Sequence, residues 1–79
     1  MKIPRDISGS KLIKKLKKYG YEKTRQTGSH IRLTTQENGE HHITIPKHNP
    51  LRVGTISGIL SEVANHLNKT KDEILKELF

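Results

Sequence analysis

The chain has 79 residues and carries 15 Lys and Arg against 8 Asp and Glu, a formal net charge of +7. A chain of this length buries only roughly 60–65% of the surface that its unfolded form exposes, so we expect one small core and a single domain over residues 1–79. No apolar run approaches the ~18 residues needed to span a membrane, so we expect no membrane contact. The absence of cysteine excludes disulfide scaffolds, iron–sulfur sites and thiolate nucleophiles, and it fits a cytoplasmic location.

The positive charge is concentrated in the first half of the chain. Residues 1–35 hold ten Lys and Arg and two acids, a net charge of +8, whereas residues 36–79 carry a net charge of −1. One strongly cationic end indicates a polyanionic partner, either a nucleic acid or an acidic protein. A basic surface that only confers solubility is the alternative.

The spacing of apolar residues predicts a first helix from Ser8 or Ser10 to Tyr19, with Gly20 as its stop. Its buried stripe consists of Leu12, Ile13, Leu16 and Tyr19. A second set at helical spacing is cationic and consists of Lys11, Lys14, Lys15 and Lys18. Like charges at this spacing destabilise a helix by a few tenths of a kcal/mol per pair, which bound phosphates would offset. An ordinary solvated face is the alternative.

Three strands are predicted next, at Tyr21–Thr27, Ser29–Thr35 and His41–Pro46, with Gly28 bending the chain between the first two. The last two strands alternate aliphatic and polar residues. Placing their aliphatic residues on one face pairs Ile31 with Ile45 and Leu33 with Ile43. That register predicts a three-residue hairpin loop over residues 37–39, with Gly39 at its last position.

The same register places polar pairs on the opposite face: Thr34 across from His42, Arg32 from Thr44, and His30 from Pro46. A helix then begins at Gly54-Thr55, with Ile56, Ile59, Leu60, Val63 and Leu67 on one face. Thr70 and Glu73 predict a capping box for a short last helix that docks through Ile74, Leu75 and Leu78. The predicted fold class is therefore α+β, with a three-stranded antiparallel sheet whose helices cover one face and leave the other wet.

The five histidines do not have the spacing of a metal site. His41 and His42 are adjacent on a strand and point to opposite faces. No paired ligand spacing supports convergence of His30, His42 and His48. We therefore expect no metal and no cofactor.

His30 is the strongest candidate for chemistry. On the wet face it lies beside Arg32, and we expect it to lie under the lysine-rich helix. An imidazole can exchange a proton near neutral pH. RNA supplies its own nucleophile, the 2′-OH next to the scissile phosphate, so a positioned base suffices without a metal. Arg or Lys side chains can stabilise the charge that develops on phosphate. The alternative is a surface histidine without a catalytic role.

The motifs Gly28-Ser29-His30, Ile45-Pro46-Lys47-His48 and Gly54-Thr55-Ile56, in this order, resemble the HicA family of toxin–antitoxin mRNA interferases. The resemblance covers about residues 8–79. It implies a fold like that of double-stranded-RNA-binding domains, metal-independent cleavage of mRNA and neutralisation by a HicB-type antitoxin. It also implies that His30 is the catalytic histidine. Many members carry a polar residue or a second histidine next, where this chain has Ile31, which we expect in the core without loss of activity.

The other candidates concern RNA contacts. We expect RNA to contact the four lysines of the first helix, Ser29, and a sheet face carrying Arg32 with Lys23 or Arg25. His48 is either functional, as the acid that protonates the leaving oxygen or as a phosphate contact, or a structural residue of the Pro46–Pro50 turn. We expect His41 and His66 to be structural or solvated, and His42 to be a bystander on the RNA face. A non-catalytic RNA-binding module and a protein that mainly binds an acidic antitoxin are the alternative functions.

Overall fold

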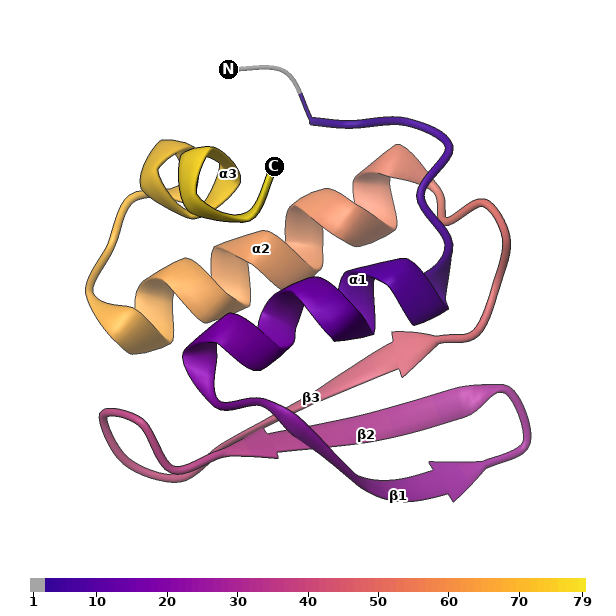
Figure 1. The fold of residues 1–79 in the computed structure, drawn as a ribbon, viewed down its shortest axis with the longest axis horizontal. Helices are drawn as coiled ribbons and strands as arrows, with labels where there is room; N and C mark the ends of the chain where they lie inside the picture. The colour runs from indigo at the N-terminus through magenta and orange to yellow at the C-terminus, as the bar shows by residue number, and fades with distance from the viewer. Residues whose placement is uncertain (1–2) are drawn as a thin grey trace.

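The structure is a computed structural model that describes residues 3–79. One helix and a 3₁₀ turn precede three strands, and two helices follow them (Figure 1). The elements are α1 (Gly9–Leu16), the 3₁₀-helix η1 (Lys17–Tyr19), β1 (Glu22–Thr27), β2 (His30–Thr35), β3 (His41–Pro46), α2 (Val53–Leu67) and α3 (Lys71–Leu78). The order confirms the predicted α+β class, with a three-stranded antiparallel sheet in the order β1-β2-β3.

Helix α1 begins where the Ser8 side chain accepts a hydrogen bond from the backbone N–H of Lys11 at 3.1 Å. The predicted single helix tightens into η1 after Leu16 and ends at Gly20, whose φ of 81° is the left-handed conformation expected of a glycine stop. Leu12, Leu16 and Tyr19 are buried as predicted, whereas Ile13 is only partly buried.

The pairing of β2 with β3 confirms the predicted register. Ile31 lies opposite Ile45 and Leu33 opposite Ile43, and all four side chains are at most 5% exposed. All three helices lie on this side of the sheet (Figure 1). The opposite side, here called the open face, carries the polar side chains of the same two strands: His30, Arg32, Thr34, His42 and Thr44. Strand β1 begins at Glu22, one residue after the predicted start at Tyr21, whose side chain is fully buried in the core.

The connection between β2 and β3 is longer than predicted. The last pair is Thr35 with His41, so residues 36–40 form the loop in place of the expected residues 37–39. Asn38 and Gly39 both have positive φ, 57° and 98°. The end of α2 holds this loop: His66 Nε2 donates to the carbonyl oxygens of Glu37 and Gly39 at 2.8 and 3.0 Å, and Asn38 donates back to the His66 carbonyl at 2.7 Å.

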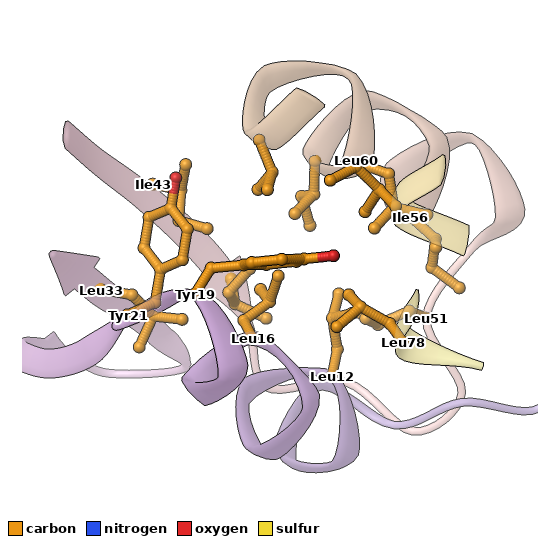
Figure 2. Close-up of a cluster of buried hydrophobic side chains, with 14 of the residues drawn as sticks. Leu12, Leu16, Tyr19, Tyr21, Leu33, Ile43, Leu51, Ile56, Leu60 and Leu78 are labelled. Atoms are coloured by element: carbon orange, nitrogen blue, oxygen red, sulfur yellow. The ribbon is translucent and has the colours of Figure 1, made fainter. Parts of the chain in front are cut away.

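The core lies between the sheet and the helices. Figure 2 shows Tyr19 between leucines of α1 and the residues that α2 contributes. Ile56, Ile59, Leu60 and Val63 of α2 are buried, and Leu67 packs against the cluster at its edge. The Thr70–Glu73 capping box is present, and α3 docks through Ile74, Leu75 and Leu78 as predicted.

Candidate functional site

A tight turn places His30 at the first position of β2. Thr27 pairs with His30, so Gly28 and Ser29 alone form the turn, and Gly28 has a φ of 58° that favours glycine. The Ser29 carbonyl accepts the backbone N–H of Lys47 at 2.6 Å. The turn is therefore tied to the segment that follows β3, and the backbone of His30 is fixed on both sides.

The His30 side chain is exposed on the open face, as the register predicted. It lines a shallow hollow together with Arg25, Thr27, Arg32 and Thr44. Among residues 3–79, no side chain forms a hydrogen bond with the His30 imidazole. Both ring nitrogens are thus available to a ligand, and two guanidinium groups border the same hollow.

The two arginines of this hollow are direct neighbours across strands β1 and β2. Arg25 and Arg32 are paired residues, and both are exposed. Like charges directly opposite in an antiparallel pair are destabilising. An anion in the hollow would relieve this repulsion and would lie beside His30.

A β-bulge determines which cations reach the open face. The β1–β2 register shifts between Lys23 and Arg25, which inserts Thr24 as an extra residue. Lys23 pairs with the core residue Leu33 and lies on the helix side of the sheet, whereas Arg25 lines the His30 hollow. Of the two residues that the sequence left open for the open face, the structure selects Arg25.

The lysines of α1 lie on the helix side of the sheet, whereas His30 lies on the open face. The expectation that His30 lies under this helix is wrong, because α1 packs on the aliphatic face and His30 projects from the opposite one. Adjoining hollows on the helix side are lined by a set of cations, here called the lysine surface: Lys11, Lys14, Lys15, Lys17, Lys23 and Lys47. Sequence reasoning missed Lys17 and Lys47, although Lys47 stands inside the Pro-x-His motif.

Two residues that the sequence proposed for the site, Lys18 and His48, line neither the His30 hollow nor the lysine surface. The Lys18 ammonium donates to the Glu77 carbonyl at 3.3 Å and so is directed toward α3. His48 is exposed, its carbonyl accepts the Gly9 N–H at 2.8 Å, and its side chain is not among those lining the His30 hollow. The backbone bond ties the turn after β3 to the start of α1.

Comparison with protein families matches residues 9–64 to the family described as the HicA toxin of bacterial toxin–antitoxin systems. The chain belongs to the HicA family. The match begins at the first residue of α1 and includes the whole sheet and most of α2. HicA toxins pair with an antitoxin, so this chain is the toxin of such a pair. No curated protein and no solved structure gives a significant match to the chain.

Further along the open face of this HicA toxin, a chain of hydrogen bonds crosses all three strands. Glu40 Oε2 bonds His42 Nε2 at 2.9 Å, His42 Nδ1 bonds the Thr34 hydroxyl at 2.7 Å, and that hydroxyl bonds Thr24 at 2.9 Å. The hydrogen bond from His42 and a second from Gln36 lower the pKa of Glu40, so its carboxyl group is ionised at neutral pH. The sequence placed His42 on this face but missed Glu40.

Two further histidines, His41 and His66, make structural contacts on the helix side of this HicA toxin. The rings of His41 and His66 stack with centroids 4.3 Å apart, and His41 Nδ1 bonds the Tyr21 hydroxyl at 2.7 Å. Burial raises the pKa of Tyr21 to about 12, so its hydroxyl stays protonated and donates. Burial, followed by the neighbouring His66, lowers the pKa of His41, so the ring is neutral and accepts.

The part of the chain that the structure describes, residues 3–79, contains neither a candidate metal site nor a candidate membrane span. No group of three or more His, Asp or Glu side chains in this range is arranged to hold a metal ion. No helix in the same range has the length and apolar character to cross a membrane.

Proposed function

We propose that this HicA toxin is an endoribonuclease that cleaves mRNA in the cytoplasm without a metal or other cofactor. The observation that carries the proposal is the exposed His30, whose imidazole has no hydrogen-bond partner among residues 3–79 and lines one hollow with Arg25 and Arg32. The family resemblance at Gly28-Ser29-His30 supports the same residue as the catalytic base.

The mechanism follows from the chemistry of these three side chains. His30 removes the proton of the ribose 2′-OH, and the 2′-oxygen attacks the adjacent phosphorus. The bond to the 5′-oxygen breaks, which leaves a 2′,3′-cyclic phosphate and a 5′-hydroxyl. Arg25 and Arg32 stabilise the additional negative charge on the phosphate oxygens. No metal is needed to generate a nucleophile, because the attacking hydroxyl belongs to the substrate and is already in place.

The proton for the leaving 5′-oxygen comes from solvent or from His48. The residues that line the hollow include no second imidazole, which favours solvent. His48→Ala tests the alternative. A loss of cleavage as large as that of His30→Ala would assign the acid role to His48, and near wild-type cleavage would assign it to water.

The decisive experiment is cleavage of an unpaired oligoribonucleotide by purified protein. His30→Ala lowers the cleavage rate by roughly 10²–10⁴ because it removes the general base. Because the side chain is exposed, the thermal unfolding temperature and RNA affinity stay close to those of the wild type. Cleavage persists in EDTA. Wild-type cleavage by His30→Ala would refute the assignment, and loss of cleavage in EDTA would indicate a metal-dependent mechanism.

We infer that the antitoxin, of HicB type according to the resemblance, binds the cationic surfaces and so excludes RNA. Replacing Lys14 and Lys15, which line the lysine surface, by Glu weakens binding of RNA and of the antitoxin together if one surface serves both. An effect on one partner alone would show that the two bind separate sites. Both equilibria are measured with the same purified variant.

The second candidate function is RNA binding without cleavage. It is favoured by the position of the lysine surface, which lies on the helix side of the sheet, away from His30 on the open face. A non-catalytic RNA-binding module would show salt-sensitive RNA affinity, with a slope of about −0.7 per phosphate contact, and no cleavage product. The oligoribonucleotide assay separates the two functions directly.

A further inference from the structure

The hydrogen-bonded chain from Glu40 to Thr24 has no role in the cleavage step proposed above. It joins the loop after β2, strand β3, strand β2 and the bulge of β1, so it fixes its members relative to the whole sheet. The side chains of His42 and Glu40 are nevertheless 37% and 61% exposed. A carboxylate is thus held in a defined position and remains open to a ligand.

This carboxylate lies on the same face as His30. Thr34, which bonds His42, stands four residues after His30 on β2, a separation of about 13 Å along an extended strand. Arg32 lies between them on the same face and is close enough to Glu40 to contribute to lowering its pKa. One RNA strand whose phosphates contact Arg25 and Arg32 can therefore reach Glu40 with a neighbouring nucleotide.

A carboxylate beside this path repels phosphate, so its favourable contacts with RNA are to hydrogen-bond donors, the ribose 2′-OH or the N–H groups of a base, and only a base contact distinguishes one nucleotide from another. An ionised carboxylate only accepts hydrogen bonds. Guanine presents two adjacent N–H donors, N1 and N2, on its Watson–Crick edge. Adenine and cytosine each place an acceptor nitrogen beside their amino group, and uracil flanks its single N–H with carbonyl oxygens. Unpaired RNA exposes this edge, whereas a duplex hides it.

We propose that Glu40, held in place by His42, binds the Watson–Crick edge of an unpaired guanine near the bond that His30 cleaves. The proposal rests on the function proposed above, since it takes RNA on the open face as given. Glu40 is then a specificity-determining residue, and His42 is a positioning residue that acts through it.

The test measures base preference by binding, separately from cleavage. The full chain carrying His30→Ala is titrated with two short unpaired oligoribonucleotides, one of adenine only and one with a single central guanine. The guanine oligomer binds about tenfold more tightly, within the range of a good two-donor base contact. Adding Glu40→Gln places an amide N–H against one guanine donor, and the preference disappears.

Glu37→Gln is the matched control. It removes the same charge from the same loop, but Glu37 approaches Gly20 on the helix side of the sheet. It raises affinity for both oligomers alike and keeps the guanine preference. His42→Gln removes the imidazole that bonds Glu40 and leaves the bond from Gln36, so it reduces the preference without removing the carboxylate.

Three outcomes would overturn either the proposed RNA substrate or the guanine assignment. If neither oligomer binds, the proposed RNA substrate is wrong. If both bind equally, RNA binding stands and the guanine assignment fails. If Glu40→Gln lowers the unfolding temperature and leaves the preference unchanged, the hydrogen-bonded chain is a structural link between strands and Glu40 does not read RNA.

Discussion

The two faces of the sheet are built from alternate residues of the same strands, yet they have opposite properties. On the helix side Ile31, Leu33, Ile43 and Ile45 are nearly inaccessible. On the open face His30 and Arg32, each next to one of those residues, are exposed. Stability and the proposed chemistry are therefore carried by neighbouring positions, and single substitutions can separate them.

The largest expected loss of stability comes from the covered face, the side of the sheet on which the helices pack. Leu33→Ala removes a side chain that is 0% exposed and leaves a cavity between the sheet and the helices. The free energy of unfolding falls by about 2–5 kcal/mol. Chemical denaturation measures it, with Thr44→Ala on the open face as the control, expected within about 0.5 kcal/mol of the wild type. Equal losses in both variants would show that the open face is also packed.

A smaller loss of stability is expected from a substitution where α1 meets the end of β3. A Cβ at Gly9 would collide with the carbonyl oxygen of Pro46, which is backbone and cannot rotate away. Gly9→Ala therefore displaces α1 and costs about 1–3 kcal/mol in the free energy of unfolding. Gly58→Ala is the control, because a Cβ there meets nothing within 4 Å, and it stabilises α2 by up to about 1 kcal/mol. Thermal unfolding that moves in the same direction for both would contradict the predicted collision.

The covered face was predictable from the sequence because a strand has a side-chain period of two. Four aliphatic residues at alternating positions leave one register that buries them all, and this register also placed His30 and Arg32 on the open face. The loop over residues 36–40 was not predictable. Its shape depends on hydrogen bonds from His66, a residue far along the chain that comes near only when α2 packs.

The cations of the site were harder to predict than its histidine. The sequence could not show the bulge at Thr24, which depends on the pairing of β1 with β2 and decides between Arg25 and Lys23. Helical periodicity grouped Lys11, Lys14 and Lys15 correctly, but it included Lys18, which is directed toward α3, and omitted Lys17. The expectation that His30 lies under this helix failed because the helices cover the aliphatic face of the sheet, whereas His30 lies on the opposite face, where the same strand pattern had placed it.

The covered face also contains a titratable group whose effect depends on pH. Burial and the stacked His66 lower the pKa of His41 below its ordinary value of 6.5, and Tyr21, Glu62 and His42 are its other polar or charged neighbours. The unfolded chain thus binds a proton more readily, and the contribution of His41 to stability, complete above about pH 6.5, is lost as the pH falls toward the folded pKa. Thermal unfolding between pH 8 and pH 5 measures this loss. His41→Gln shows a flatter pH dependence over the same range, and an unchanged slope would assign the loss to other groups.

The smallest expected change in stability concerns the open face and has the opposite sign. Arg32→Gln removes one of two cations that lie directly opposite each other on β1 and β2, so the free energy of unfolding rises by about 0.2–1 kcal/mol. If phosphate binding compensates this repulsion, the same variant binds RNA more weakly, and the slope of log affinity against log salt decreases by about 0.7. Lys76→Gln, an exposed change on α3, is the matched control and leaves both quantities near the wild type. A variant that gains stability and keeps the wild-type salt slope would show that Arg32 does not contact phosphate, and the RNA path would then have to avoid the centre of the open face.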